Sequence, residues 1–82
     1  MLNYLDLDEN NIKEFQNKIM ENVKQIRKEK NISQTELAQT IGHKSVSTIG
    51  KIEANIENKH YNIEQLYKIS YALEVDICKF FK

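Results

Sequence analysis

Residues 32–53 constrain the fold more than any other stretch, because they predict two short helices joined by a tight turn. Ser33 is followed three residues later by Glu36, which is the capping-box pattern that begins a helix. Gly42 stands where this helix should end, and glycine readily takes the left-handed backbone found at helix C-termini. A second amphipathic helix is expected from about Ser45, so the stretch has the arrangement of a helix-turn-helix unit.

The composition of the whole chain also favours helices. Its 82 residues include no proline and only two glycines, so few positions interrupt a helix. A chain of this length makes one domain with a small core. We therefore predict an all-α domain over residues 11–82, preceded by an N-terminal arm of residues 1–10.

The first helix of this domain is predicted to be long. Asp8 or Asn10 can cap its start, and it should run to about Lys30. Its apolar side chains recur every three or four residues and form one stripe, made of Ile12, Phe15, Ile19, Val23 and Ile26.

Two further helices are expected after a polar loop over residues 55–61. Asn62 can cap the first of them, whose apolar stripe consists of Ile63, Leu66, Ile69 and Leu73. Asp76 can cap a last short helix that buries Ile77 and Phe80. With the long helix and the helix-turn-helix pair, these elements bring the predicted number of helices to five.

The cysteine count and the hydropathy pattern exclude several classes of protein. A single cysteine, Cys78, excludes an internal disulfide and a cysteine-based zinc site, and it fits a reducing cytoplasm. No run of about 18 apolar residues could span a membrane, and no basic stretch leads into an apolar block at the N-terminus. We expect a cytoplasmic protein with no membrane partner.

The sequence contains no pattern typical of a catalytic or metal site. Its two histidines, His43 and His60, lack a cysteine or carboxylate at the spacing of metal ligands. No Ser-His-Asp order, glycine-rich phosphate loop or pair of catalytic carboxylates stands out. We therefore expect no enzymatic activity, no catalytic residue, no metal and no cofactor.

Taken together, these elements make the chain resemble the phage-repressor-like helix-turn-helix family, also called Cro/XRE. The resemblance covers roughly residues 23–81. It is carried by an ordered set of motifs: Ser33-Gln34-x-x-Leu37-Ala38, Gly42, Ile49-x-x-Ile52-Glu53, Leu66-x-x-Ile69-x-x-Ala72-Leu73-x-Val75 and Phe80-Phe81. It implies a five-helix, lambda-repressor-like DNA-binding domain, here with an extended first helix.

The chain departs from the family pattern at two places. Residues 42–49, which hold the turn and the start of the third helix, are one residue longer than the commonest spacing. The glycine that usually follows the third helix is replaced by Asn55, which tolerates a left-handed backbone nearly as well.

The resemblance implies that the third helix enters the DNA major groove and that the start of the second helix meets the phosphate backbone. Small hydroxyl side chains can approach base edges, Val46 can meet a thymine methyl, and Lys51 can reach guanine or a phosphate. Gln34 begins the second helix, where free backbone N–H groups can hold a phosphate. The expected DNA-binding residues are Gln34, Thr35, Lys44, Ser45, Val46, Ser47, Thr48, Lys51 and Lys59.

Two charged residues are expected to support this site without touching DNA. In the family, residues at the positions of Arg27 and Glu53 commonly form an ion pair that joins the first helix to the third. Arg27 is the only arginine in the chain, and its planar guanidinium suits a bidentate carboxylate partner better than lysine does.

Three aromatic residues near the C-terminus exceed what a small core needs. Tyr67 and Tyr71 stand one helical turn apart, and Phe81 lies near the end of the chain. We expect them to form a homodimer interface, since a two-fold dimer places two helix-turn-helix units on half-sites about 34 Å apart.

The leading hypothesis is a dimeric, sequence-specific transcriptional regulator whose partner is double-stranded DNA. A phage or mobile-element repressor, a restriction–modification controller and an antitoxin all fit it. The alternative is a protein-interaction module, such as an antitoxin that binds a protein partner, which keeps this fold but has little DNA affinity. The net charge of zero favours the alternative. However, residues 1–21 hold five acidic against two basic groups, whereas the remaining residues hold ten basic against seven acidic groups. The acidic excess thus lies in the N-terminal part, and the helix-turn-helix part is mildly basic.

Overall fold

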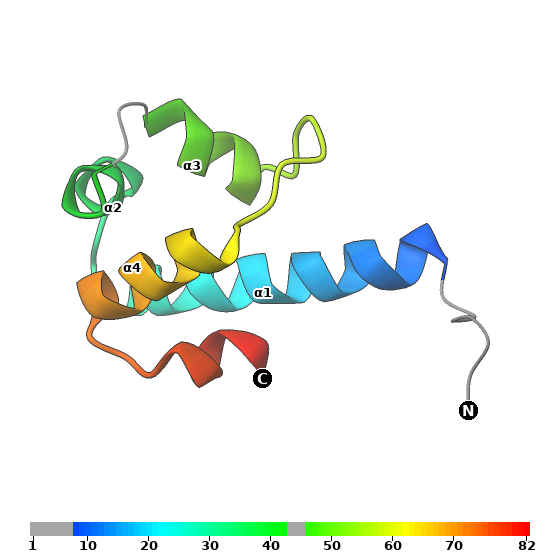
Figure 1. Ribbon diagram of the computed structural model, residues 1–82. Coiled ribbons are helices and arrows are strands. Elements are labelled where there is room, and N and C mark those ends of the chain that lie inside the picture. Colours follow the sequence, from blue (N-terminus) through cyan, green and yellow to red (C-terminus); the bar gives the residue numbers. More distant parts are fainter. Residues whose placement is uncertain (1–7, 43–45) are drawn as a thin grey trace.

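The computed structural model describes residues 8–42 and 46–82, which form four α-helices and one 3-10 helix (Figure 1). In chain order these are α1 (Glu9–Glu29), α2 (Gln34–Thr40), α3 (Val46–Glu53), α4 (Ile63–Leu73) and the 3-10 helix η1 (Ile77–Phe81). The described residues contain no strand, which confirms the all-α prediction. The predicted fifth α-helix is η1, because a segment this short more readily forms the tighter 3-10 turn.

Helix α1 extends beyond the elements that pack against it. It begins at Glu9, and the carboxylate of its N-cap, Asp8, accepts a hydrogen bond from the Asn11 backbone N–H at 3.0 Å. Two residues assigned to the N-terminal arm thus belong to the helix. Ile12 and Phe15 are 52% and 53% exposed, because the first turns of α1 project past the other helices (Figure 1). Only the later part of the predicted apolar stripe reaches the core.

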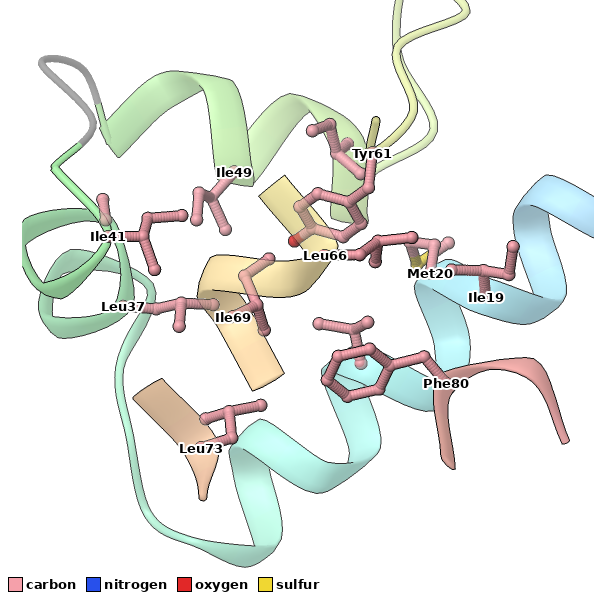
Figure 2. Packing of buried hydrophobic residues seen from close by; sticks show 13 residues of the cluster. Ile19, Met20, Leu37, Ile41, Ile49, Tyr61, Leu66, Ile69, Leu73 and Phe80 are labelled. Carbon is pink, nitrogen blue, oxygen red and sulfur yellow. The ribbon is translucent and has the colours of Figure 1, made fainter. Parts of the chain in front are cut away.

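One hydrophobic core joins all five elements (Figure 2). Burying an aliphatic or aromatic side chain of this kind contributes about 1.5–3 kcal/mol. Because α2 and α3 are too short to be stable alone, this packing is what keeps them helical. The side chains with no exposed surface are Val23, Leu37, Ala38, Ile49, Ile69, Leu73 and Phe80.

Element η1 closes the core against α1 and α4. The Phe80 ring is fully buried, as predicted, and the Asn22 side-chain amide donates a hydrogen bond to the Phe80 carbonyl oxygen at 3.0 Å. Ile77, also predicted to be buried, is half-buried.

Side-chain caps fix where α2 and α4 begin. The Glu36 backbone N–H donates to Ser33 Oγ at 3.0 Å, and the Ser33 N–H donates to Glu36 Oε1 at 3.3 Å, which confirms the predicted capping box. Asn62 caps α4, as predicted. Gly42 follows α2 with a φ of 79°, the left-handed conformation expected of it.

Helix α4 carries two apolar faces. The residues that the sequence analysis assigned to its core face are buried except for Ile63, which is 71% exposed. The assignment of Ile63 to the core stripe is therefore wrong. Ile63 precedes Tyr67 and Tyr71 by four and eight residues, and helical spacing places all three on one outward face. We call this surface (Ile63, Tyr67 and Tyr71) the α4 outer face.

Tyr61 is the one described residue with a buried side-chain polar atom that has no hydrogen-bond partner among the described residues. Its ring points from the loop before α4 into the core (Figure 2), and the residue is 8% exposed. Burial, reinforced by the negative charge of Glu53, raises the pKa of the Tyr61 phenol far above its usual range. The hydroxyl therefore stays neutral, and it carries a desolvation cost without a compensating bond.

The substitution Tyr61→Phe should leave the free energy of unfolding unchanged or raise it by up to about 1 kcal/mol, because no hydrogen bond is lost. Urea unfolding followed by circular dichroism measures this. Leu66→Ala, which opens a cavity in the same core, should cost about 2–5 kcal/mol and provides the contrast. A loss of more than about 1 kcal/mol in Tyr61→Phe would reveal a stabilising partner of the hydroxyl.

Candidate nucleic-acid interface

Helices α2 and α3 pack against each other, and α3 lies at the outer edge of the molecule (Figure 1). The inner side of α3 is anchored by Ile49 and Ile52, which are 0% and 2% exposed. The outer side presents Val46, which is 37% exposed, and the exposed Ser47. The helix therefore turns one face into the core and offers the other to a partner.

The predicted DNA-binding residues are distributed over this outer side and its borders. Thr48 and Lys51 are half-buried on α3, whereas Thr35 is exposed in the first turn of α2. Lys59 is exposed in the loop after α3. The predicted contacts Lys44 and Ser45 lie outside the described residues.

A bidentate ion pair joins α1 to the end of α3. Arg27 Nε donates to Glu53 Oε2 at 2.8 Å, and Arg27 Nη2 donates to Glu53 Oε1 at 2.8 Å. The two side chains are 8% and 3% exposed. Arg27 Nη1 also donates to the Ile32 carbonyl oxygen at 2.7 Å, so the same guanidinium holds the segment that leads into α2.

Gln34 completes this arrangement from α2. Its amide Nε2 donates to Glu53 Oε1 at 2.9 Å, so the carboxylate binds one residue from each of α1 and α2. We call Arg27, Glu53 and Gln34 the carboxylate network. Gln34 was predicted to bind phosphate, and its contact with Glu53 was not predicted. A signal was present, since a carboxylate has more acceptor sites than one arginine fills.

The carboxylate network depends on the ionised form of Glu53. Burial by itself would raise the pKa of the Glu53 carboxyl, but the hydrogen bonds from Arg27 and Gln34 and the charge of Arg27 outweigh it and lower the pKa. A carboxyl whose pKa is lower in the folded state stabilises the fold above its unfolded pKa. That stabilisation is lost as the pH falls through the folded pKa.

Lys51 has a partner that the sequence analysis did not anticipate. Its ammonium lies 3.4 Å from Glu57 Oε1 and 3.5 Å from Glu57 Oε2. The Lys51 side chain is 40% exposed and that of Glu57 is 54% exposed. A carboxylate thus stands beside the lysine on the outer side of α3.

The residues predicted to form a dimer interface are not all in contact. Tyr67 and Tyr71 touch, with ring centroids 5.0 Å apart and a hydrogen bond of 3.1 Å between their hydroxyls. They are 55% and 70% exposed. Phe81 is half-buried and stacks on Phe15 of α1, with ring centroids 6.4 Å apart. Its partner within the chain is therefore α1.

Two open hollows flank the tyrosines. One, of about 690 Å³, lies between the end of α2 and α4 and is lined in part by Ile41, Gly42 and Ala72. The other, of about 420 Å³, borders Val75 and Ile77. Within the described residues, no helix is long and apolar enough to cross a membrane, and no three His, Cys, Asp or Glu side chains group as metal ligands.

Breaking the carboxylate network should destabilise the fold. Arg27→Ala should lower the free energy of unfolding by about 3–5 kcal/mol at neutral pH, because it leaves the Glu53 carboxylate buried without its charge partner. Lys28→Ala, an exposed neighbour on the same helix, should cost less than about 0.5 kcal/mol. Urea unfolding of both variants gives the comparison.

The difference between these two variants should also depend on pH. It should shrink as the pH falls below 4.5, the ordinary value for the Glu53 carboxyl, because protonation removes the charge that Arg27 balances. Equal stabilities of Arg27→Ala and Lys28→Ala at neutral pH would show that the ion pair has no structural role.

Comparisons with known proteins agree with this geometry. A family model described as helix-turn-helix, HTH_3, matches residues 23–80, which include α2, α3, α4 and the later part of α1. Neither the curated proteins nor the solved structures give a match. Because the family match spans most of the chain and coincides with the observed helix pair, this protein belongs to the Cro/C1-type helix-turn-helix family of DNA-binding regulatory domains.

Proposed function

We propose that this protein is a sequence-specific transcription regulator that binds an operator as a homodimer, with α3 in the major groove. The observation that carries the proposal is the outer side of α3, which the carboxylate network holds in a fixed orientation. A helix that reads base edges must keep its position against the rest of the domain, and the network joins α3 to both α1 and α2.

The residue types on this surface suit direct readout. Ser47 and Thr48 carry small hydroxyls that can approach bases, Val46 can pack on a thymine methyl, and Lys51 can donate to guanine. We propose that Thr35 at the start of α2 and Lys59 in the loop after α3 contact phosphates. Lys44 and Ser45 remain predicted DNA contacts. Gln34 holds α2 against Glu53, and we propose that it also contacts the phosphate backbone of DNA.

The charge of the surface implies modest affinity for non-specific DNA. In the described part of residues 33–60, Lys51 and Lys59 are the cations, and exposed carboxylates stand at Glu36 and Glu57. Non-specific binding depends mainly on neutralising phosphates, which this balanced surface does weakly. Recognition must therefore depend on base contacts.

Replacement of Lys51 tests this function. Lys51→Ala should weaken binding to a selected operator by about 1–3 kcal/mol if the lysine donates to a base. Lys79→Ala, in η1 and exposed, should leave the affinity unchanged. Operators would first be selected from a random duplex library, and affinities then measured by fluorescence anisotropy.

The opposite result favours the alternative function. If selection enriches no sequence and no variant binds duplex DNA at low salt, the chain is better described as a protein-interaction module on this fold. The zero net charge is the observation behind that alternative.

The homodimer is proposed to form through the α4 outer face. Its three large side chains are 71%, 55% and 70% exposed, and the two tyrosines line both hollows beside α4. In a two-fold arrangement the same patch meets itself, so the tyrosines of one copy can enter the hollow of the other. The larger hollow borders Gly42, directly before the segment leading to α3, so a partner there would hold the two α3 helices at a fixed separation.

Charge introduced on this face should separate the copies. Tyr71→Asp is expected to give a monomer in sedimentation equilibrium at tens of micromolar and to lose the affinity gained from binding two half-sites. Ile12→Asp, also an exposed apolar residue but on α1, should remain a dimer. Phe81→Asp tests the third predicted interface residue, and a smaller effect is expected because Phe81 stacks on Phe15 of its own chain. A monomeric wild-type protein would contradict the proposal.

A further inference from the structure

The loop after α3 returns over the end of that helix. The Asn55 backbone N–H donates to the Ile52 carbonyl oxygen at 3.1 Å, and the Ile56 N–H donates to the Lys51 carbonyl oxygen at 2.9 Å. These two bonds, with Asn55 at a φ of 58°, form a Schellman motif. The motif reverses the chain, and the next residue, Glu57, comes to lie beside the Lys51 side chain.

The backbone at Glu57 is unusual for its residue type. Three loop residues have a positive φ: Asn55 at 58°, Glu57 at 60° and Asn58 at 56°. Asparagine tolerates this conformation, whereas glutamate gains nothing from it locally. The position nevertheless carries a glutamate, and its carboxylate faces the ammonium of Lys51.

We propose that Glu57 is a built-in competitor of DNA that limits non-specific binding by holding Lys51. This inference rests on the proposed DNA-binding function. Both Glu57 oxygens lie within 3.5 Å of the Lys51 ammonium, so a phosphate that approaches this lysine competes with a carboxylate already beside it. Glu57 also brings a negative charge to the surface that a phosphate backbone would approach.

The competition acts most strongly where only phosphates are bound. Non-specific complexes form almost entirely through cation–phosphate contacts and counterion release, so each occupied lysine reduces both affinity and salt dependence. The Lys51–Glu57 pair is exposed and contributes little to stability. Its effect should therefore appear in DNA binding and leave the folded state intact.

The test uses a random-sequence duplex, so no operator is needed. At about 0.1 M salt, Glu57→Gln should bind it about 3–8-fold more tightly than wild type, and the slope of log K against log salt should become steeper by about 0.9. Glu57→Asn removes the same charge and suits the left-handed backbone, so it should also bind more tightly. Glu21→Gln, an exposed carboxylate on α1, is the matched control and should change neither quantity.

A double-mutant cycle separates the Lys51 contact from general repulsion. In the Lys51→Ala background, Glu57→Gln should raise the affinity by less than half of the wild-type gain on a logarithmic scale. An equal gain in both backgrounds, or no gain in Glu57→Gln and Glu57→Asn while wild type binds DNA, would overturn the inference alone. Absence of DNA binding by every variant would overturn the proposed function together with it.

Discussion

The buried carboxylate of Glu53 is the interaction on which the orientation of α3 depends. It accepts hydrogen bonds from Arg27 on α1 and from Gln34 on α2, so three helices meet at one side chain. An unpaired carboxylate in this position would be costly in free energy. Glu53 therefore needs the donors on α1 and α2 to stay in place. Apolar contacts at Ile49 and Ile52 hold α3 against the core, but the hydrophobic effect behind them is not directional. The directional bonds to Glu53 fix the angle at which α3 meets the rest of the domain.

A second carboxylate near α3, that of Glu57, lies in a different environment. Glu53 is buried and accepts three hydrogen bonds that hold the helices together, whereas Glu57 is exposed and faces one lysine. They are only four positions apart in the sequence, and the reversal at Asn55 places them on different sides of α3. Burial decides the difference: a charge removed from water must be paired, whereas an exposed pair exchanges partners readily.

Helix positions were predictable because the local signals agree with one another. The capping box at Ser33, the glycine at Gly42 and the Asn62 cap each have a mechanism that acts within a few residues. The partner of Arg27 was anticipated through the family resemblance. Gln34 was assigned incompletely, Ile63 was assigned wrongly, and the contact of Glu57 with Lys51 was not predicted, since the surroundings of these residues depend on how the chain packs around them. Ile63 shows the limit well, because its three-residue spacing to Leu66 fits the core stripe and its four-residue spacing to Tyr67 fits the outer face.

The part of α1 that precedes the family match packs against the C-terminal end of the chain. The family match covers residues 23–80. Two contacts involve residues outside it: Asn22 donates to the Phe80 carbonyl oxygen, and Phe15 stacks on Phe81. These two contacts join residues that are 58 and 66 positions apart in the sequence. Such contacts raise the mean sequence separation of native contacts, so folding should be slower than for a bundle whose contacts are all local. A fragment cut at the family boundaries would lack the surface on which η1 rests and would leave the Phe80 side of the core open to water.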